Sequence, residues 1–426
     1  MDTYLADSVF MRHLENLYGN SPEEVRSATD RFRRLTDTYE ELYAGQPALL
    51  ASAPGRVELC GNHTDHNNGR VLAAAVQLDT IAAASPTTDN VITIRSDGYD
   101  APFRIHVDEL DPVRQEEGTT NALIRGTAAR FRDFDYSIGG LNAVVMSDVL
   151  PGSGLSSSAS IEILLGTLFN TLFNNGRIPP AQLAHIGQYA ENTFFRKPCG
   201  LMDQLTCALG GIVHIDFADP ASPLTRTLRS RFDDHDISLL VVHTGATHED
   251  LTAEYAAVPG EMKEVARYFG YDVLRDLPAE PFLRAIPELR TEVGDRAILR
   301  ALHFFSENER VTELVRALEH DDVDRFLSIM LASGSSSARW LQNCAAPGSV
   351  RRQGIMIALA LSEWYIHQAG RGATRVHGGG FAGTILTALP KASVPGYVKT
   401  MEEVFGDGAV TVLRVRNTGA LALATA

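Results

Sequence analysis

Polar side chains crowd into residues 53–69, a run that begins as a strand and is bracketed by glycines. It reads Ala-Pro-Gly-Arg-Val-Glu-Leu-Cys-Gly-Asn-His-Thr-Asp-His-Asn-Asn-Gly. The run combines an arginine, two histidines and an aspartate with further amides and carboxylates. Burying such groups costs free energy unless a ligand or a partner satisfies their hydrogen bonds. We therefore expect a binding site in this segment.

A second segment, 150–160, has the composition of an anion-binding loop. It reads Leu-Pro-Gly-Ser-Gly-Leu-Ser-Ser-Ser-Ala-Ser and joins a predicted strand to a predicted helix. The two glycines let the backbone approach a ligand, and the helix start offers unpaired N–H donors. Three serine hydroxyls are suited to phosphate or Mg²⁺. The alternative is a serine-rich helix cap, but three serines directly after two glycines favour phosphate binding.

Other phosphate-binding motifs do not fit the sequence. It contains no G-x-x-x-x-G-K-[ST] pattern, which excludes a Walker loop. A formal G-x-G-x-x-G occurs at Gly378, Gly380 and Gly383. That run joins two predicted strands instead of opening a helix, so it does not indicate a dinucleotide site.

The elements that must position these segments alternate between strands and helices. Residues 1–45 predict two helices, which we interpret as packing decoration or an oligomer contact. Short β runs are predicted at 71–76, 91–94, 103–107, 141–146, 211–217, 237–242, 374–377, 383–388 and 409–415. Helices are predicted at 120–131, 156–172, 180–194, 201–209, 250–268, 296–318, 322–343, 352–369 and 394–405. The chain of 426 residues favours two domains.

Composition indicates an ordinary globular protein, with 44% hydrophobic and 21% charged residues. The net charge of −15 argues against nucleic acid and anionic membranes as partners. Four cysteines without framework spacing predict free thiols in a reducing compartment. Neither a signal pattern nor an apolar run of roughly 18 residues is found, so we expect a cytoplasmic protein.

Three segments together resemble the galactokinases of the GHMP kinase family. Residues 55–66 resemble G-R-V-N-L-I-G-E-H-T-D-Y, residues 150–160 the second family motif, and residues 198–204 the stretch P-C-G-I-M-D-Q-F. The run 375–383 resembles the third motif, with His377 in place of Thr. The resemblance implies an α+β fold of two domains with the active site between them. The first domain would be ribosomal protein S5 domain 2-like and the second ferredoxin-like.

The domain boundaries that we expect are a helical extension over 1–45, an N-terminal kinase domain over 46–225 and a C-terminal kinase domain over 226–426. The activity implied is ATP-dependent phosphorylation of the anomeric hydroxyl of galactose or a closely related sugar. ATP and Mg²⁺ would be the cofactors, and sugar and ATP the partners of a monomer or weak homodimer.

Family motifs assign roles to individual residues. Asp203 would be the catalytic base and Arg56 its companion. Sugar contacts are implied for Asn62, His63, Asp65, Gly200 and Tyr255. ATP contacts are implied for Gly152, Ser153, Gly154, Leu155, Ser156, Ser157, Ser158 and Ala159. Ser158 and Glu191 would hold Mg²⁺.

Two positions depart from the family signature: Glu58 stands where it has Asn, and Asn62 where it has Glu. In the family the carboxylate at position 62 accepts a hydrogen bond from the sugar's C6 hydroxyl. A neutral Asn62 raises the alternative of a C6-altered sugar, such as galacturonate or arabinose. Glu58 is open between a salt bridge facing away from the sugar and a second acid near Mg²⁺.

Three other functions agree less well with the sequence. His63, Asp65 and His66 have atoms that bind zinc, but they lie in a loop and match the family's H-T-D. The sequence contains no G-x-S-x-G elbow, which a serine hydrolase of that type would need. A non-catalytic regulator that binds ATP and sugar is disfavoured because the serine loop, Arg56, Glu191 and Asp203 are all present.

Overall fold

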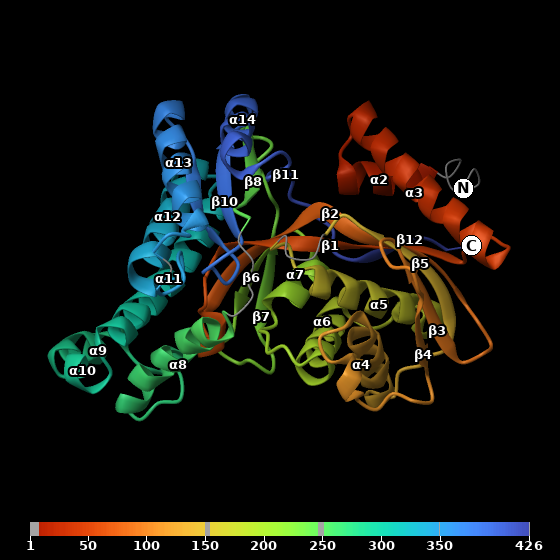
Figure 1. The fold of residues 1–426 in the computed structure, drawn as a ribbon, viewed down its shortest axis with the longest axis horizontal. Coiled ribbons are helices and arrows are strands. Elements are labelled where there is room, and N and C mark those ends of the chain that lie inside the picture. Colours follow the sequence, from red (N-terminus) through yellow and green to blue (C-terminus); the bar gives the residue numbers. More distant parts are fainter. Residues whose placement is uncertain (1–7, 150–153, 246–250, 349, 426) are drawn as a thin grey trace.

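Two β-sheets, each covered by helices, make up the chain in the computed structural model, which describes residues 8–149, 154–245, 251–348 and 350–425. Figure 1 shows the larger sheet with its helices on one side of the molecule and the smaller sheet with its helices on the other. The α+β class expected from the sequence is confirmed, since helices pack on two separate sheets.

The larger sheet is built around two long strands, β1 (Leu49–Cys60) and β2 (Arg70–Pro86). Its strand order is β12-β1-β2-β5-β3-β4, with β6 pairing with β2 and β7 with β6. The remaining strands are β3 (Val91–Ser96), β4 (Phe103–His106), β5 (Leu141–Ser147), β6 (Ile212–Asp216), β7 (Leu224–Leu228) and β12 (Leu421–Thr425). Every residue of β1 is buried, because helices cover both faces of the sheet.

Four helices pack on one face of this sheet and form the main core with it. They are α4 (Thr120–Asp133), α5 (Ser157–Asn174), α6 (Pro180–Tyr189) and α7 (Met202–Leu209). On the opposite face lie α2 (Ser8–Tyr18) and α3 (Pro22–Tyr43), whose apolar stripe includes Phe10, Leu14, Phe32 and Leu35. A capping box precedes α3, with Ser21 and Glu24 bonded reciprocally. Helices α2 and α3 therefore cover this face of the sheet.

The smaller sheet is antiparallel in the order β11-β8-β10-β9. Its strands are β8 (Ile237–His243), β9 (Ala373–His377), β10 (Thr384–Pro390) and β11 (Val410–Leu413), and α14 (Val394–Phe405) connects the last two. With helices inserted between β8 and β9, the chain order is that of a ferredoxin-like β-α-β-β-α-β unit. The last strand, β12, returns to the larger sheet and pairs with β1. The predicted boundary at residue 225 stays a prediction.

The helices between β8 and β9 project beyond the smaller sheet (Figure 1). They are α8 (Thr252–Tyr268), α9 (Ala279–Arg284), α10 (Ile286–Glu292), α11 (Asp295–Glu319), α12 (Val323–Ser336) and α13 (Gly354–Ala369). The sequence pattern predicts four of the six and misses α9 and α10, which are too short to show a clear period. It also stops the second strand at residue 76, whereas β2 continues to Pro86.

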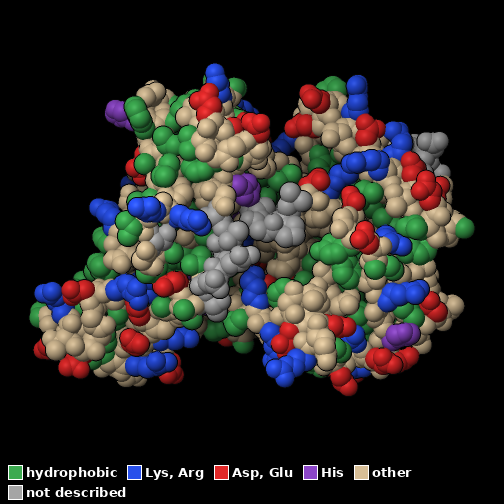
Figure 2. All heavy atoms as spheres, viewed as in Figure 1, with side chains coloured by type: hydrophobic (Ala, Val, Ile, Leu, Met, Phe, Trp, Pro, Cys, Tyr) green, Lys and Arg blue, Asp and Glu red, His purple; other side chains and the backbone are tan. Residues whose placement is uncertain are grey.

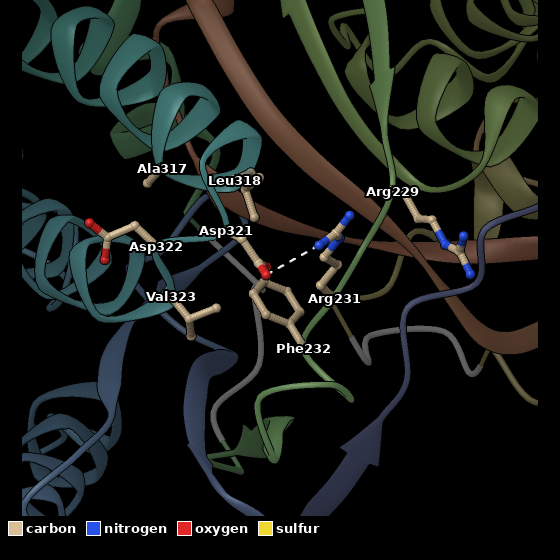
Figure 3. Close-up of a pocket in the computed structure, with 8 residues that line it drawn as sticks. All are labelled: Arg229, Arg231, Phe232, Ala317, Leu318, Asp321, Asp322 and Val323. Atoms are coloured by element: carbon tan, nitrogen blue, oxygen red, sulfur yellow. Dashed lines mark hydrogen bonds and ion pairs between the residues drawn. The ribbon is translucent and has the colours of Figure 1, made fainter.

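On the face in view in Figure 2, acidic and basic side chains are interspersed, and neither sign forms a continuous patch. Within the described residues, no helix is both long and apolar enough to cross a membrane. A small cavity lies where the segment before β8 meets the α11–α12 turn, and it is crossed by an Arg231–Asp321 ion pair (Figure 3). None of the predicted site residues lines it.

Candidate active site

An irregular part of β1 orients Arg56 toward the helices that pack on the larger sheet. The pairing of β1 with β2 shifts register on both sides of the segment 56–58, as β-bulges do. At Gly55 an added Cβ would lie 2.9 Å from the Leu155 carbonyl oxygen, so the strand can approach the phosphate loop this closely only with a glycine. The Arg56 N–H then donates to that same carbonyl at 3.0 Å.

Arg56 and Asp203 form a bidentate pair. Arg56 Nε donates to Asp203 Oδ1 and Nη2 donates to Oδ2, both at 2.6 Å. The remaining nitrogen, Nη1, donates to the Gly154 carbonyl at 2.6 Å. Arg56 is buried, while the Asp203 side chain keeps about a quarter of its surface exposed. The carboxylate is thus fixed in orientation but open to a ligand.

The charge state of Asp203 follows from two opposed effects. Burial alone raises the pKa of a carboxyl group, but the positive charge and hydrogen bonds of Arg56 outweigh it here, and the pKa of Asp203 lies below its ordinary value. Ser156 Oγ adds a third donor at 2.6 Å. Asp203 is therefore ionised at neutral pH and able to accept a proton from a hydroxyl group.

The described part of the phosphate loop ends in the first turn of α5. Ser156, the residue before the helix, has a left-handed φ of 64°, and α5 begins at Ser157. The first N–H groups of α5 have no carbonyl partner within the helix, so they can bind an anion. Of the ATP contacts implied by the resemblance, Gly152 and Ser153 lie outside the described residues. The other six run from Gly154, whose carbonyl Arg56 contacts, into the first turn of α5 at Ala159.

Ser158 and Glu191 meet next to this helix start. Ser158 Oγ donates to Glu191 Oε1 at 2.9 Å, and Lys197 Nζ lies 3.1 Å from the same oxygen. Glu191 is buried and sits in a π-helical turn, Ala190–Phe195, that follows α6. Such turns recur at functional sites because they re-aim side chains within a helix. The sequence predicts a continuous helix here and misses the turn.

The oxygen atoms around Glu191 fit a hard cation. Gln204 Nε2 donates to Glu191 Oε2 at 2.8 Å and to Glu162 Oε2 at 3.0 Å. Glu162 is buried, and burial together with the nearby Glu191 charge raises its pKa well above the ordinary value. Its Oε1 atom has no hydrogen-bond partner among the described residues. A carboxylate, a hydroxyl and phosphate oxygens form the ligand set that Mg²⁺ prefers.

The residues assigned to the sugar gather around the glycine loop that follows β9. The His63 Nε2–H donates to the Gly379 carbonyl at 2.8 Å, and the Tyr255 hydroxyl donates to the Gly380 carbonyl at 2.8 Å. Burial lowers the pKa of His63 to about 4, so this ring is neutral. Gly200 lies directly against the Asp65 carboxylate, and an added Cβ would collide with Asp65 Oδ2. Because Gly200 precedes Asp203 by three residues, the sugar contacts and the proposed base share one region.

A zinc site at His63 and His66 finds no support in this geometry. The His63 ring nitrogen is engaged by a backbone carbonyl. Across the residues that the structure describes, no group of three or more His, Cys, Asp or Glu side chains is arranged to hold a metal. The serine–glutamate pair differs from such a cluster, since Mg²⁺ commonly completes its shell with phosphate and water.

Two residues of α11 hold the signature from behind, and sequence reasoning missed both. Glu307, fully buried, accepts hydrogen bonds from the Gly61 N–H at 3.1 Å and Cys60 Sγ at 3.2 Å. His303 Nε2 donates to the Asn62 carbonyl at 3.0 Å. A signal is available in the sequence: His303 and Glu307 are four residues apart and fall within the helical spacing of the buried Ala301, Phe304 and Val311.

Comparison with known proteins gives a consistent result. Two family models match the sequence, "Galactokinase galactose-binding signature" over residues 37–86 and "GHMP kinases N terminal domain" over residues 122–211. Galactokinase of Streptomyces coelicolor is 30% identical over 380 residues, which cover 89% of this chain and 94% of that protein. Galactokinase of Actinobacillus pleuropneumoniae is 31% identical over 374 residues, covering 84% and 90%.

Solved structures show the same fold. Lactococcus lactis galactokinase complexed with galactose superposes with a TM-score of 0.77 at 22% identity, covering 91% of this chain and 99% of that one. Methanococcus jannaschii mevalonate kinase superposes with a TM-score of 0.61 at 14% identity, covering 86% and 98%.

Proposed function

Because the chain belongs to the galactokinase family of GHMP kinases, we propose that it transfers the γ-phosphoryl group of ATP to the anomeric hydroxyl of galactose, giving galactose 1-phosphate and ADP. The observation that carries this assignment is the bidentate Arg56–Asp203 pair placed at the N-terminus of α5. A proton acceptor, a fixed positive charge and an anion-binding helix end are the parts that phosphoryl transfer needs.

Each described residue has a place in this reaction. Asp203 accepts the proton of the anomeric hydroxyl as its oxygen attacks phosphorus. Arg56 holds Asp203 ionised and stabilises negative charge on the transferred group. The N–H groups at the start of α5 hold phosphate oxygens, while the hydroxyl of Ser156 donates to Asp203. Ser158 and Glu191 would bind Mg²⁺, which supplies charge neutralisation between the phosphates when bound.

We propose that the sugar lies between Asp203 and the glycine loop, contacted by His63, Asp65, Gly200 and Tyr255. Asp65 and His63 match the family's signature, which supports a galacto-configured ring. Asn62 is buried and already bonded to protein groups, which supports weaker recognition of the C6 substituent. An alternative substrate is therefore a C6-altered sugar such as galacturonate or arabinose.

A sugar panel tests the substrate assignment. ADP release would be measured with galactose, galacturonate, arabinose and N-acetylgalactosamine at saturating ATP. We expect the highest kcat/KM for galactose. We expect the ratio of kcat/KM for galactose to that for arabinose to be smaller in the wild type than in a variant with a charged residue at position 62. A preference for galacturonate over galactose would replace the galactose assignment, and ATP turnover with none of the four sugars would refute sugar kinase activity.

We also propose that the enzyme works in the cytoplasm as a monomer or weak homodimer. All four cysteines are free thiols, which supports a reducing compartment. Sedimentation across a range of protein concentrations would separate a monomer from a weak dimer.

A further inference from the structure

The two signature positions that depart from the family pattern touch each other. Asn62 Nδ2 donates to Glu58 Oε2 at 3.1 Å, and both side chains are almost completely buried, with 1% and 3% of their surface exposed. Relative to the family's pattern, the amide and the carboxylate have exchanged places. The two departures are therefore one reciprocal change and not two independent ones.

Asn62 uses nearly all of its hydrogen-bonding capacity within the protein. Both Nδ2 hydrogens are engaged, one with Glu58 and one with the Gly378 carbonyl at 2.7 Å. Its Oδ1 atom accepts from Asn343 Nδ2 at 2.6 Å. A side-chain amide has two donor hydrogens and two lone pairs, so one lone pair is left for any other group. The amide is thus an anchor inside the protein.

Glu58 is held in place by Arg375 of β9. Arg375 Nη2 lies 3.4 Å from Glu58 Oε1, and Nη1 donates to the Glu58 backbone carbonyl at 3.2 Å. Both side chains are buried, and a buried guanidinium that loses its carboxylate is left as an uncompensated charge. This settles the two options for Glu58 in favour of a salt bridge, to Arg375.

The network of Glu58, Asn62 and Arg375 fastens the glycine loop 378–380 to the sugar signature. Three successive carbonyls of the loop accept hydrogen bonds: Gly378 from Asn62, Gly379 from His63 and Asn343, and Gly380 from Tyr255. Gly378 and Gly380 have left-handed φ values of 67° and 80°, so the loop depends on its glycines. Its position is set by Asn62 and His63 of the signature together with Asn343 and Tyr255.

We propose that Glu58 and Asn62 act as one pair of positioning residues, the carboxylate holding Arg375 and the amide holding the Gly378 carbonyl, so that the glycine loop is fixed where sugar and phosphate meet. The activity readout of this proposal rests on the proposed sugar kinase function. The coupling between the two side chains does not.

A double-exchange cycle tests the pair, using wild type, Glu58→Asn, Asn62→Glu and the combined exchange. Glu58→Asn removes the carboxylate bonded to Arg375 and leaves Glu307 as the acidic group that still acts on it. Asn62→Glu brings two carboxylates together and removes the donor to the Gly378 carbonyl. The combined exchange again sets one amide against one carboxylate, in the order of the family pattern, but restores neither the charge at position 58 nor the donor to Gly378. We expect each single change to lower kcat/KM for galactose by about tenfold or more, and the combined variant to recover part of that loss, so that its loss is smaller than the product of the two single losses.

Glu58→Gln provides a second test in case the single exchange variants fail to fold. It keeps the shape of the side chain and the Asn62 contact but removes the charge facing Arg375. It should fold and lower kcat/KM, mainly through KM. Asp79→Asn is the matched control, since Asp79 is a buried carboxylate paired with an arginine outside this network. It should lower the unfolding midpoint and leave KM unchanged.

Recovery in the combined variant supports the proposal. Losses that simply multiply, or a Glu58→Gln enzyme with unchanged KM, would overturn it. If wild type phosphorylates no sugar, the proposed function fails, and the cycle is then read from unfolding midpoints. A combined variant more stable than the two single effects predict would still support the pair, and additive effects on stability would overturn it.

Discussion

Arg56 on β1 and Asp203 on α7 are joined through two parallel hydrogen bonds of 2.6 Å, although 147 residues separate them in the sequence. The same guanidinium also holds the Gly154 carbonyl of the phosphate loop. One arginine therefore sets the relative placement of the proton acceptor and the phosphate-binding helix end.

Removing the carboxylate of Asp203 should abolish most turnover. Asp203→Asn keeps the size of the side chain but cannot take the anomeric proton, so we expect kcat to fall roughly 10²- to 10⁴-fold. Binding of galactose, measured by calorimetry, should change little. A variant that retains a tenth of the wild-type kcat would show that another group is the base.

Arg56 should control the acid side of the pH profile. Because the pKa of Asp203 lies below its ordinary value, its basic form persists well into the acid range, and activity is lost only as pH falls through that lowered pKa. Arg56→Gln removes the lowering charge, so the acid limb of kcat/KM should move toward neutral pH and kcat should fall. An acid limb at the same pH in both enzymes would contradict this account.

Glu191 should set the requirement for Mg²⁺. Glu191→Gln removes the charge but keeps the contacts with Ser158 and Gln204 possible, so the Mg²⁺ concentration for half-maximal activity should rise about tenfold or more. KM for galactose should stay close to wild type. Titration of activity with Mg²⁺ at fixed free ATP gives the answer, and an unchanged half-saturation point would remove Glu191 from the cation site.

His377 should make the protein less stable toward acid pH. Burial, together with the charges of Arg56 and Arg375, lowers its pKa to about 3, whereas an unfolded histidine titrates near 6.5. At pH values between these two, the unfolded chain binds the proton and the folded chain does not. The free energy of unfolding therefore decreases by about 1.4 kcal/mol for each unit by which the pH is lowered.

Comparison with His377→Gln isolates this contribution. The longer amide of glutamine can still donate to the Gly154 carbonyl, which His377 Nε2 contacts at 2.9 Å. Urea unfolding at pH 7, 6 and 5 should show the free-energy difference between wild type and variant shifting in favour of the variant as pH falls. A constant difference would mean that His377 binds protons equally in the folded and unfolded states, which would contradict the lowered pKa.

Asp79 should be essential for stability and irrelevant to catalysis. It is fully buried, and it binds Arg31 of α3, Arg416 near the C-terminus and the hydroxyl of Tyr18 in α2. Asp79→Asn leaves the buried Arg416 without its carboxylate and Arg31 with only the half-exposed Asp148, and removing one partner of a buried ion pair typically costs about 3–5 kcal/mol. Unfolding measurements should show this loss, while kcat/KM should remain unchanged at 25 °C. A large change in KM would indicate that the N-terminal helices influence the site.

Local patterns could predict much of the fold and the site. The strand before Arg56, the glycine–serine loop and the apolar stripe of α5 are properties of neighbouring residues, so they can be read from the sequence. The resemblance then placed Arg56, Glu191 and Asp203 in one site, and the structure brings Arg56 to Asp203 and Glu191 to Ser158.

Long-range contacts could not be predicted in this way. Asn62 meets the Gly378 carbonyl across 316 residues, and no local pattern encodes that approach. The buried Asp79 appears in the sequence as one carboxylate among many, because its partners come from both ends of the chain. The π-helical turn at Glu191 could not be predicted either, because a single extra residue in one turn hardly changes the spacing of apolar residues along the helix.

The most direct test of the central claim is the position of the phosphate in the product. Wild-type enzyme and Asp203→Asn would each be incubated with ATP, Mg²⁺ and galactose, and the products would be assigned by ³¹P and ¹H nuclear magnetic resonance. The account predicts galactose 1-phosphate in equal amount to ADP with wild type, and almost none with Asp203→Asn. Phosphate on another hydroxyl would contradict this account. Formation of galactose 1-phosphate by Asp203→Asn at the wild-type rate would contradict it as well.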